Sequence, residues 1–235
     1  MSRATAIHPP IYVLLGCPGS GKGTFAQAIQ SEGYDHLSTG DMTREEVKKG
    51  TAFGRKYKDA ILNHVIGGIP FEEIQRLVEQ RLEKGIRERH GIILDGYPKT
   101  KEQCELLDRF FQKKGLKNKE VIVLIDVLEK NAIDRILYRQ TCEKCNQIYS
   151  AMFSPSKIQD KCDACGGGLT KRMDDNVHGM KKRVHEFKRK MEPVIAYYKK
   201  SGRLNVVDGN ASADVCRERF AQFHRTMQER AFESA

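Results

Sequence analysis

Residues 16–24 combine glycines, a lysine and a hydroxyl at the spacing of a polyphosphate-binding loop. The segment follows the apolar run 11–15 and precedes an apolar-periodic segment that begins at Phe25, so it joins a predicted strand to a predicted helix. Such a turn directs backbone N–H groups at one point, where the positive end of the helix dipole also lies, and Lys22 adds a full charge. In contrast to the general pattern, the hydroxyl comes two residues after the lysine, at Thr24. The chain is therefore predicted to bind a polyphosphate.

Four cysteines have the spacing of a metal site. They form two pairs, each with two residues between its members, and 16 residues separate the pairs, which agrees with the zinc spacing C-x2-C-x15–20-C-x2-C. Four thiolates complete a tetrahedral shell and leave no position for water, so the zinc ion is expected to be structural. Two disulfides or a redox pair are the alternatives. The cysteines are Cys142, Cys145, Cys162 and Cys165.

One carboxylate is placed to work with the phosphate loop. Asp95 ends the apolar run 91–95, a predicted strand beside the loop, where it could organise the water shell of Mg²⁺ together with Thr24. A simple turn residue is the alternative interpretation of Asp95.

Charge and composition limit the class of protein. The 235 residues include 41 Lys and Arg against 31 Asp and Glu, a net charge of +10, which favours polyanionic partners such as nucleic acid or small polyphosphates. The longest clean apolar run, 121–125, is far shorter than the about 20 residues of a membrane span. Residues 1–10 lack the apolar stretch of a secretory signal. We expect a cytoplasmic protein without a membrane partner, with an organellar matrix as the alternative location.

The elements that must position these residues alternate along the chain. Strand-like runs alternate with helical patterns, which is typical of a parallel sheet with crossover helices. Strands are predicted near 11–15, 35–37, 91–95, 121–126 and 203–208. Helices are predicted near 22–31, 40–49, 55–65, 71–84, 101–113, 129–139, 175–200 and 212–229. Segments 39–70 and 140–172 break the alternation and are predicted to be insertions that could close over the phosphate site.

Several motifs resemble those of the nucleoside monophosphate kinases, and specifically of the adenylate kinases. Residues 16–24 are similar to the GxPGxGKGT loop of that family, and segments 37–44, 93–100 and 169–175 are similar to its other signatures. The four-cysteine insertion resembles the zinc-bearing lid of the long adenylate kinases. The resemblance extends from residue 11 to about residue 210, with the motifs in the family's order.

The resemblance implies an α/β fold of the P-loop NTPase type, with three layers and a five-stranded parallel sheet. It implies a core of residues 1–38, 71–139 and 173–235, a helical AMP-binding insertion at 39–70 and a zinc-binding lid at 140–172. The implied reaction is reversible, direct in-line phosphoryl transfer from Mg-ATP to AMP, which yields two ADP. Structural Zn²⁺ and ATP-bound Mg²⁺ are the implied cofactors. A monomer is expected because no long exposed apolar stripe is evident.

The resemblance also assigns roles to individual residues. The ATP-binding residues are expected to be Gly19, Ser20, Gly21, Lys22, Gly23, Thr24, Arg135, Arg139, Ile148, Tyr149 and Ala211. The AMP-binding residues are expected to be Thr39, Gly40, Arg44, Ile69, Gly96, Lys99, Gln103, Arg172 and Arg183. The catalytic cations are expected to be Lys22, Arg135, Arg139, Arg172 and Arg183. By the resemblance, Lys22 and Arg139 hold the ATP phosphates, and Arg135, Arg172 and Arg183 converge on the phosphoryl group in flight. Two of them, Arg135 and Arg139, are predicted to share one face of the helix near 129–139.

The acceptor base is less strongly specified. Thr39 and Gln103 match residues that contact AMP in adenylate kinases, which favours AMP. The loop 66–71 departs from the Gly-Lys-Leu-Val pattern that lines the adenine, and residues 176–179 replace residues that are commonly acidic. Lys99 stands where the family usually has arginine, and a lysine lacks the bidentate fork that grips a phosphate. We expect Lys99 to weaken AMP binding without abolishing activity.

Two alternative functions are also compatible with the sequence. A related kinase with another nucleotide preference, such as a GTP:AMP phosphotransferase or a UMP/CMP kinase, would keep the fold and the mechanism, and the sequence does not distinguish ATP from GTP as donor. A zinc-ribbon protein that binds nucleic acid would explain the basic charge and the four cysteines, but not the phosphate loop or Asp95. The preferred interpretation is an adenylate kinase that binds ATP, AMP and ADP and no nucleic acid.

Overall fold

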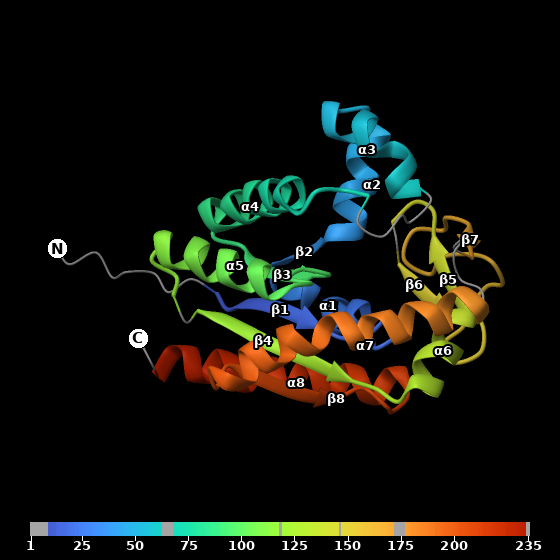
Figure 1. The fold of residues 1–235 in the computed structure, drawn as a ribbon. Helices are drawn as coiled ribbons and strands as arrows, with labels where there is room; N and C mark the ends of the chain where they lie inside the picture. The colour runs from blue at the N-terminus through green and yellow to red at the C-terminus, as the bar shows by residue number, and fades with distance from the viewer. Residues whose placement is uncertain (1–8, 63–67, 118, 146, 172–176, 234–235) are drawn as a thin grey trace.

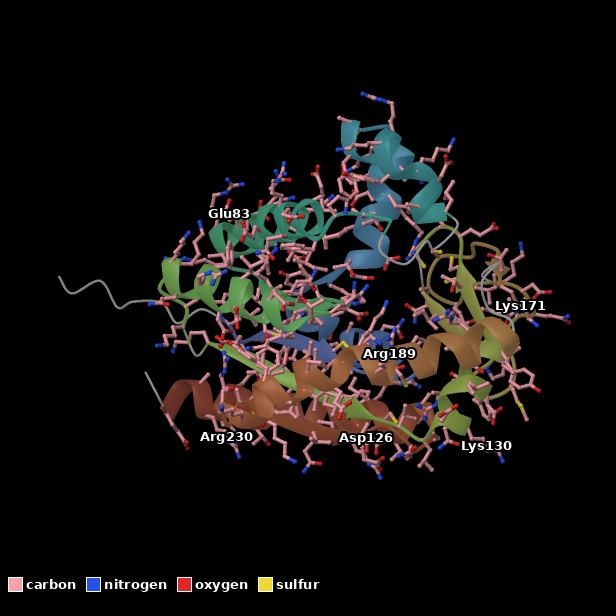
Figure 2. The ribbon with its side chains drawn as sticks, viewed as in Figure 1. Glu83, Asp126, Lys130, Lys171, Arg189 and Arg230 are labelled. Atoms are coloured by element: carbon pink, nitrogen blue, oxygen red, sulfur yellow. The ribbon has the colours of Figure 1, made fainter. Side chains whose placement is uncertain are left out.

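A five-stranded parallel sheet lies at the centre of the protein (Figure 1). The computed structural model describes residues 9–62, 68–117, 119–145, 147–171 and 177–233, and it describes the backbone alone for residues 177–186, 188 and 232. The strands of the sheet are β1 (Ile11–Leu15), β2 (Tyr34–Ser38), β3 (Gly91–Asp95), β4 (Glu120–Asp126) and β8 (Leu204–Asp208). Their spatial order is β2-β3-β1-β4-β8, and every neighbouring pair is parallel. The predicted α/β fold with a five-stranded parallel sheet is confirmed.

Helices cover both faces of the sheet because the central strands are apolar on both sides. The helices are α1 (Lys22–Ile29), η1 (Gln30–Glu32), α2 (Thr39–Lys49), α3 (Ala52–Leu62), α4 (Phe71–Glu88), α5 (Lys101–Lys113), α6 (Glu129–Leu137), α7 (Val177–Lys200) and α8 (Ala213–Glu233). Odd-numbered residues of β1 pack in one apolar cluster with α4, α5 and α7. Tyr12 and Leu14 of the same strand pack in a second cluster with α1 and α8. None of the helices in the described part of the chain has the length and apolar character needed to cross a membrane.

All eight predicted helices are present in the structure, with ends that differ by a few residues. The largest differences are in α8, which continues to Glu233 instead of ending at residue 229, and in α4, which continues to Glu88 instead of ending at residue 84. Helix α4 ends where Arg89 adopts a left-handed conformation and donates its N–H to the carbonyl oxygens of Gly85 and Ile86.

Helices α2 and α3 form an arm that stands off the end of the sheet (Figure 1). The two helices cross closely because α3 contains Gly54, where an added Cβ would lie 2.0 Å from the carbonyl oxygen of Glu46 in α2. Helix α2 begins at the end of β2, where the Ser38 hydroxyl accepts a hydrogen bond from the N–H of Asp41. The arm occupies the first part of the predicted insertion 39–70, and residues 63–67 of that insertion lie outside the described residues.

A second sheet, which the sequence analysis did not predict, lies between α6 and α7. It is antiparallel, with the order β6-β5-β7, and consists of β5 (Arg139–Cys142), β6 (Ile148–Ser150) and β7 (Leu169–Thr170). Its strands have two to four residues and no alternating apolar pattern, because the small cluster that they enclose is built on cysteines. Figure 1 shows this sheet near the arm, on the side of the molecule away from the two termini.

The prediction that Arg135 and Arg139 share a helix face is wrong. Helix α6 ends at Leu137, where the Tyr138 N–H donates to the carbonyl oxygens of Asp134 and Ile136. The carbonyl oxygen of Tyr138 then accepts a hydrogen bond from the Ala151 N–H at 2.8 Å, which draws the chain into the β5–β6 hairpin. Arg139 is therefore the first residue of β5, opposite Ser150.

A buried polar cluster attaches the C-terminal helix to the core. The side chain of His224 in α8 is fully buried, and its Nδ1 lies 2.6 Å from the hydroxyl oxygen of Tyr12 in β1. Its Nε2 lies 3.0 Å from a carboxylate oxygen of Glu32, and the Tyr34 ring packs edge-on against the imidazole. Burial lowers the pKa of His224, although the Glu32 carboxylate opposes this shift and Arg225 adds to it.

The buried histidine predicts a loss of stability in mild acid. Because the pKa of His224 is lowered on folding, the folded state favours the neutral ring. The resulting stabilisation is complete above the unfolded pKa of about 6.5 and is lost as the pH falls below it. We expect the free energy of unfolding to decrease between pH 7.5 and 5.5, by at most about 1.4 kcal/mol per pH unit for this one proton. Urea unfolding of the wild type and of His224→Gln would check this, and equal pH slopes for the two proteins would contradict it.

Candidate nucleotide site and metal centre

The phosphate loop lies between β1 and α1, as predicted. Gly21 precedes α1 with a left-handed conformation (φ 107°), and Gly19 is also left-handed (φ 80°). A Cβ at Gly19 would lie 2.2 Å from the carbonyl oxygen of Ala132, so the loop runs directly against α6. The half-buried Lys22 folds back over the loop, and its Nζ donates to the carbonyl oxygens of Gly16 at 2.9 Å and Cys17 at 3.1 Å. An ammonium group is thereby held at the point where the loop faces the cavity.

A cavity of about 650 Å³ opens at the carboxyl ends of the strands of the central sheet. It lies between the phosphate loop, α6 and the second sheet of β5, β6 and β7, which we call the lid sheet. The carboxyl edge of a parallel sheet is where ligands bind in open α/β folds, and β1, whose neighbours β3 and β4 lie on opposite sides, marks the switch point. Predicted residues that line the cavity are Gly19, Gly21, Lys22, Gly23, Thr24, Asp95, Arg135, Arg139, Ile148, Tyr149 and Ala211. The structure thus brings together ten of the eleven predicted ATP-binding residues.

The exception is Ser20. Its side chain is fully buried, and its backbone N–H donates to the carbonyl oxygen of Cys17 at 3.0 Å. The Ser20 hydroxyl is close to Gly16, where an added Cβ would lie 2.4 Å from it. The side chain of Ser20 therefore packs behind the loop and does not line the cavity.

Asp95 ends β3 beside the phosphate loop, next to Leu14 in the register of the sheet. Its carboxylate lies 3.4 Å from Nε2 of His36 in β2. Burial of this carboxyl opposes ionisation, but the charges of Lys22, His36 and Lys99 outweigh burial and hold its pKa below the ordinary value. Asp95 is therefore ionised at neutral pH, and with the Thr24 hydroxyl in the same cavity it provides the oxygen ligands that suit Mg²⁺ and its water shell.

A further wall of the cavity is formed by α6 and the loop after β8, both of which contact the phosphate loop. Arg135 donates from Nη2 to the carbonyl oxygen of Ala211 at 2.6 Å. The side-chain oxygen of Asn210 accepts hydrogen bonds from the Leu128 N–H at 2.8 Å and from the Asn131 amide at 3.1 Å. These contacts fix the loop after β8 to α6, so that Arg135 and the backbone of Ala211 face the same cavity.

The lid sheet closes the cavity directly above the phosphate loop. Ile148 of β6 approaches so closely that a Cβ at Gly23 would lie 2.8 Å from its Cδ1. Arg139 of β5 lines the cavity from the same sheet. The walls of the site therefore come both from the core and from the four-cysteine insertion.

The predicted AMP-binding residues gather around the start of α2 and the loop after β3. The Thr39 hydroxyl donates to the carbonyl oxygen of Gly96 at 3.1 Å, and the Lys99 N–H donates to the side-chain oxygen of Gln103 at 2.7 Å. Arg44 forms an ion pair with Asp41, which itself lines the cavity.

The other predicted AMP-binding residues include Ile69, Arg172 and Arg183. Ile69 is half-buried just before α4. Arg172 lies outside the described residues, and for Arg183 only its backbone position in α7 is described.

The four cysteines come together as the sequence predicts. Their sulfur atoms all lie within 4.8 Å of one another, and the Cys142–Cys165 and Cys145–Cys162 Sγ distances are both 3.5 Å. Zn–S bonds of about 2.3 Å place the sulfurs of a tetrahedral site about 3.8 Å apart, so the spacing of the four thiols is compatible with a zinc ion. No disulfide joins these four cysteines in the structure.

Comparison with known proteins identifies the family. The family model described as adenylate kinase matches residues 14–203, most of the chain. The chain belongs to the adenylate kinase family. An adenylate kinase from Archaeoglobus fulgidus is 40% identical over 200 residues, which cover 84% of this chain and 89% of that protein. An adenylate kinase from Fervidobacterium nodosum is 37% identical over 86% of this chain and 91% of that protein. An adenylate kinase from Caldanaerobacter subterraneus is 39% identical over 86% of this chain and 90% of that protein. As a member of this family, the chain is a phosphotransferase.

His36 and Asn210 are among the residues that line the cavity but were not predicted from the sequence. His36 contacts Asp95, and it could have been found from the two-residue period of the strand, which places it on the same face as Ser38. Asn210 fixes the loop after β8, and its position just after a strand end at the ligand-binding edge was an available signal. The hydrogen bond from Arg135 to the carbonyl oxygen of Ala211 could not be predicted from the sequence, because any residue type offers a backbone carbonyl.

Lys99 stands where the family usually has arginine, so we expect its replacement by arginine to increase the affinity for AMP. The backbone N–H of Lys99 donates to the Gln103 side chain, a hydrogen bond that does not depend on which side chain stands at position 99. Because a guanidinium can bind a phosphate with two parallel hydrogen bonds, we expect Lys99→Arg to lower the KM for AMP several-fold, in line with about 1 kcal/mol for one added charge-assisted hydrogen bond. Initial rates at varied AMP and saturating ATP would measure this. An unchanged or higher KM for AMP would contradict it.

Proposed function

We propose that the protein catalyses reversible transfer of the γ-phosphoryl group of Mg-ATP to AMP, which yields two ADP, by direct in-line transfer. The observation that carries this proposal is the placement of the Lys22 ammonium, held by two loop carbonyls, in a cavity of about 650 Å³ that also contains the Asp95 carboxylate. Loop residues Gly19 and Gly21 and the first residues of α1 line the same cavity, as a polyphosphate site requires.

The cations around the cavity have separate tasks in this mechanism. Lys22 and Arg139 would hold the phosphates of ATP, including the charge that they develop in the transition state. Arg135, together with Arg172 and Arg183, would neutralise the phosphoryl group in flight. Phosphoryl transfer requires positioning of the two nucleotides and neutralisation of their charge. It requires no general base, because the acceptor is already a phosphate anion.

Two metal ions are part of the proposal. Mg²⁺ would bind with ATP, and Asp95 and Thr24 would hold it through its water shell. Zn²⁺ would bind the four cysteines and keep β5, β6 and β7 folded, since so small an apolar cluster needs a crosslink. The lid would exclude water from the transferred phosphoryl group.

For the acceptor, we propose that Thr39, Gly40, Arg44, Ile69, Gly96, Lys99 and Gln103 form the AMP site. The contacts between Thr39 and Gly96 and between Lys99 and Gln103 support this, because they place the four residues around the end of β3. We further expect a monomeric protein in the cytoplasm or an organellar matrix that binds neither nucleic acid nor membranes.

Turnover with a panel of nucleotides tests the proposal. Mg-ATP would be offered with AMP, UMP, CMP or GMP, and Mg-GTP with AMP, while the diphosphate products are separated and quantified. We expect efficient ADP formation from ATP and AMP alone. Preference for another acceptor or donor would replace the nucleotide assignment, and no transfer to any acceptor by zinc-loaded protein would overturn the proposed reaction.

A further inference from the structure

Tyr149 lies between the nucleotide cavity and the four-cysteine cluster. It is the central residue of β6, it is 9% exposed, and it is one of the residues that line the cavity. Its hydroxyl points the other way, into the cysteine cluster, where the oxygen lies 3.5 Å from Sγ of Cys162. The hydroxyl is thus directed at a predicted zinc ligand rather than at a nucleotide.

The hydrogen bonds around this hydroxyl define its direction. The backbone N–H of Asp163 donates to the Tyr149 oxygen at 2.8 Å. Asp163 is fixed in turn, because its carboxylate accepts a hydrogen bond from the Lys157 N–H at 2.9 Å. Since the phenol oxygen already accepts from Asp163, its own hydrogen is free to be donated, and the acceptor within reach is the Cys162 sulfur.

We propose that the Tyr149 hydroxyl donates a hydrogen bond to the zinc-bound thiolate of Cys162 and acts as a positioning residue of the metal centre. Hydrogen bonds of this kind orient metal ligands and withdraw charge from the sulfur, and their loss typically costs 10–100-fold in metal affinity. The inference rests on the proposed zinc site and does not depend on which nucleotides react.

The test uses the full chain with Tyr149→Phe, which keeps the ring and removes the hydroxyl. Tyr138→Phe is the matched control, because Tyr138 lies at the edge of the same lid, is 40% exposed and packs through its ring against Phe153. Zinc affinity would be measured by competition with a chromophoric chelator. The Co²⁺-substituted proteins would be compared by their sulfur-to-cobalt charge-transfer absorption.

For Tyr149→Phe we expect zinc affinity to fall 10–100-fold and the charge-transfer band to move to lower energy, since the sulfur loses a donor that stabilises its electrons. The control should match the wild type in both measurements. Unchanged affinity and an unchanged band in Tyr149→Phe would overturn the proposal, as would equal losses in both variants. Absence of stoichiometric zinc in the reduced wild type would overturn it as well, whatever the outcome of the turnover assay.

A measurement on the wild type covers the case in which the variant does not fold. In protein loaded with ¹¹³Cd, a hydroxyl hydrogen bonded to the Cys162 sulfur gives a through-bond NMR correlation between the metal and the Tyr149 hydroxyl proton. We expect this correlation, and its absence in a spectrum that resolves the correlations to the cysteine protons would overturn the proposal.

Discussion

Replacement of Lys22 by methionine is expected to lower kcat by about 10²–10³-fold and to leave the fold intact. That factor is typical for loss of a single preorganised donor that stabilises transition-state charge. The Lys22 ammonium is poised for this role, since its two present acceptors are neutral carbonyl oxygens of Gly16 and Cys17, which phosphate oxygens can replace. Methionine keeps most of the volume of the lysine stem, so packing is little disturbed.

Loss of Lys22 also removes the largest favourable charge acting on Asp95. A control for general loss of charge is Lys101→Met, since Lys101 is an exposed residue at the start of α5 that pairs with Glu105. Steady-state kinetics with ATP and AMP measure both variants. A kcat for Lys22→Met within ten-fold of wild type would exclude a role of this ammonium in the transition state.

Gly19→Ala is expected to abolish nucleotide binding in the cavity, with a loss of at least 10²-fold in kcat/KM. The new Cβ would lie 2.2 Å from the carbonyl oxygen of Ala132, which is backbone and cannot rotate away. The left-handed φ of 80° adds about 1–2 kcal/mol of strain. The phosphate loop must therefore leave α6, and its N–H groups would no longer converge on one point.

Gly33→Ala separates the clash from the strain. Gly33 has nearly the same backbone φ, 81°, but an added Cβ there meets no atom within 4 Å. We expect this control to lose about 1–2 kcal/mol of stability and to keep its kcat/KM. Urea unfolding and initial rates on both variants make the comparison. Equal activity losses would show that strain alone, and not the contact with α6, accounts for the effect at Gly19.

The core and the phosphate loop could be predicted because they follow rules that are local in the sequence. Residues 11–15 are apolar at every position, and this is typical of a strand buried on both faces of a parallel sheet. The glycines and Lys22 of the next segment carry their function in their order along the chain. The CxxC spacing likewise specifies a tetrahedral cluster without knowledge of the fold.

The lid strands and the end of α6 could not be predicted in the same way. Strands β5 to β7 are stabilised by pairing across the hairpin and by the cysteine cluster, so they need no apolar alternation of their own. The end of α6 depends on the hydrogen bond between Tyr138 and Ala151, which are 13 residues apart. The burial of the Ser20 hydroxyl depends on how the loop folds back on Gly16, which motif position does not reveal.

The change from helix to strand at Tyr138 has a consequence for protein engineering. Arg135 is anchored in the core through Ala211, whereas Arg139 belongs to the lid sheet and pairs with Ser150. A chimaera that exchanges the whole lid sheet therefore also exchanges Arg139, one of the two predicted catalytic arginines that line the cavity, and with it the spacing between their charges. A graft joined before Arg139 would replace this arginine with the residue of the donor lid. A graft joined after Arg139 would change only the rest of the lid and would keep both Arg135 and Arg139.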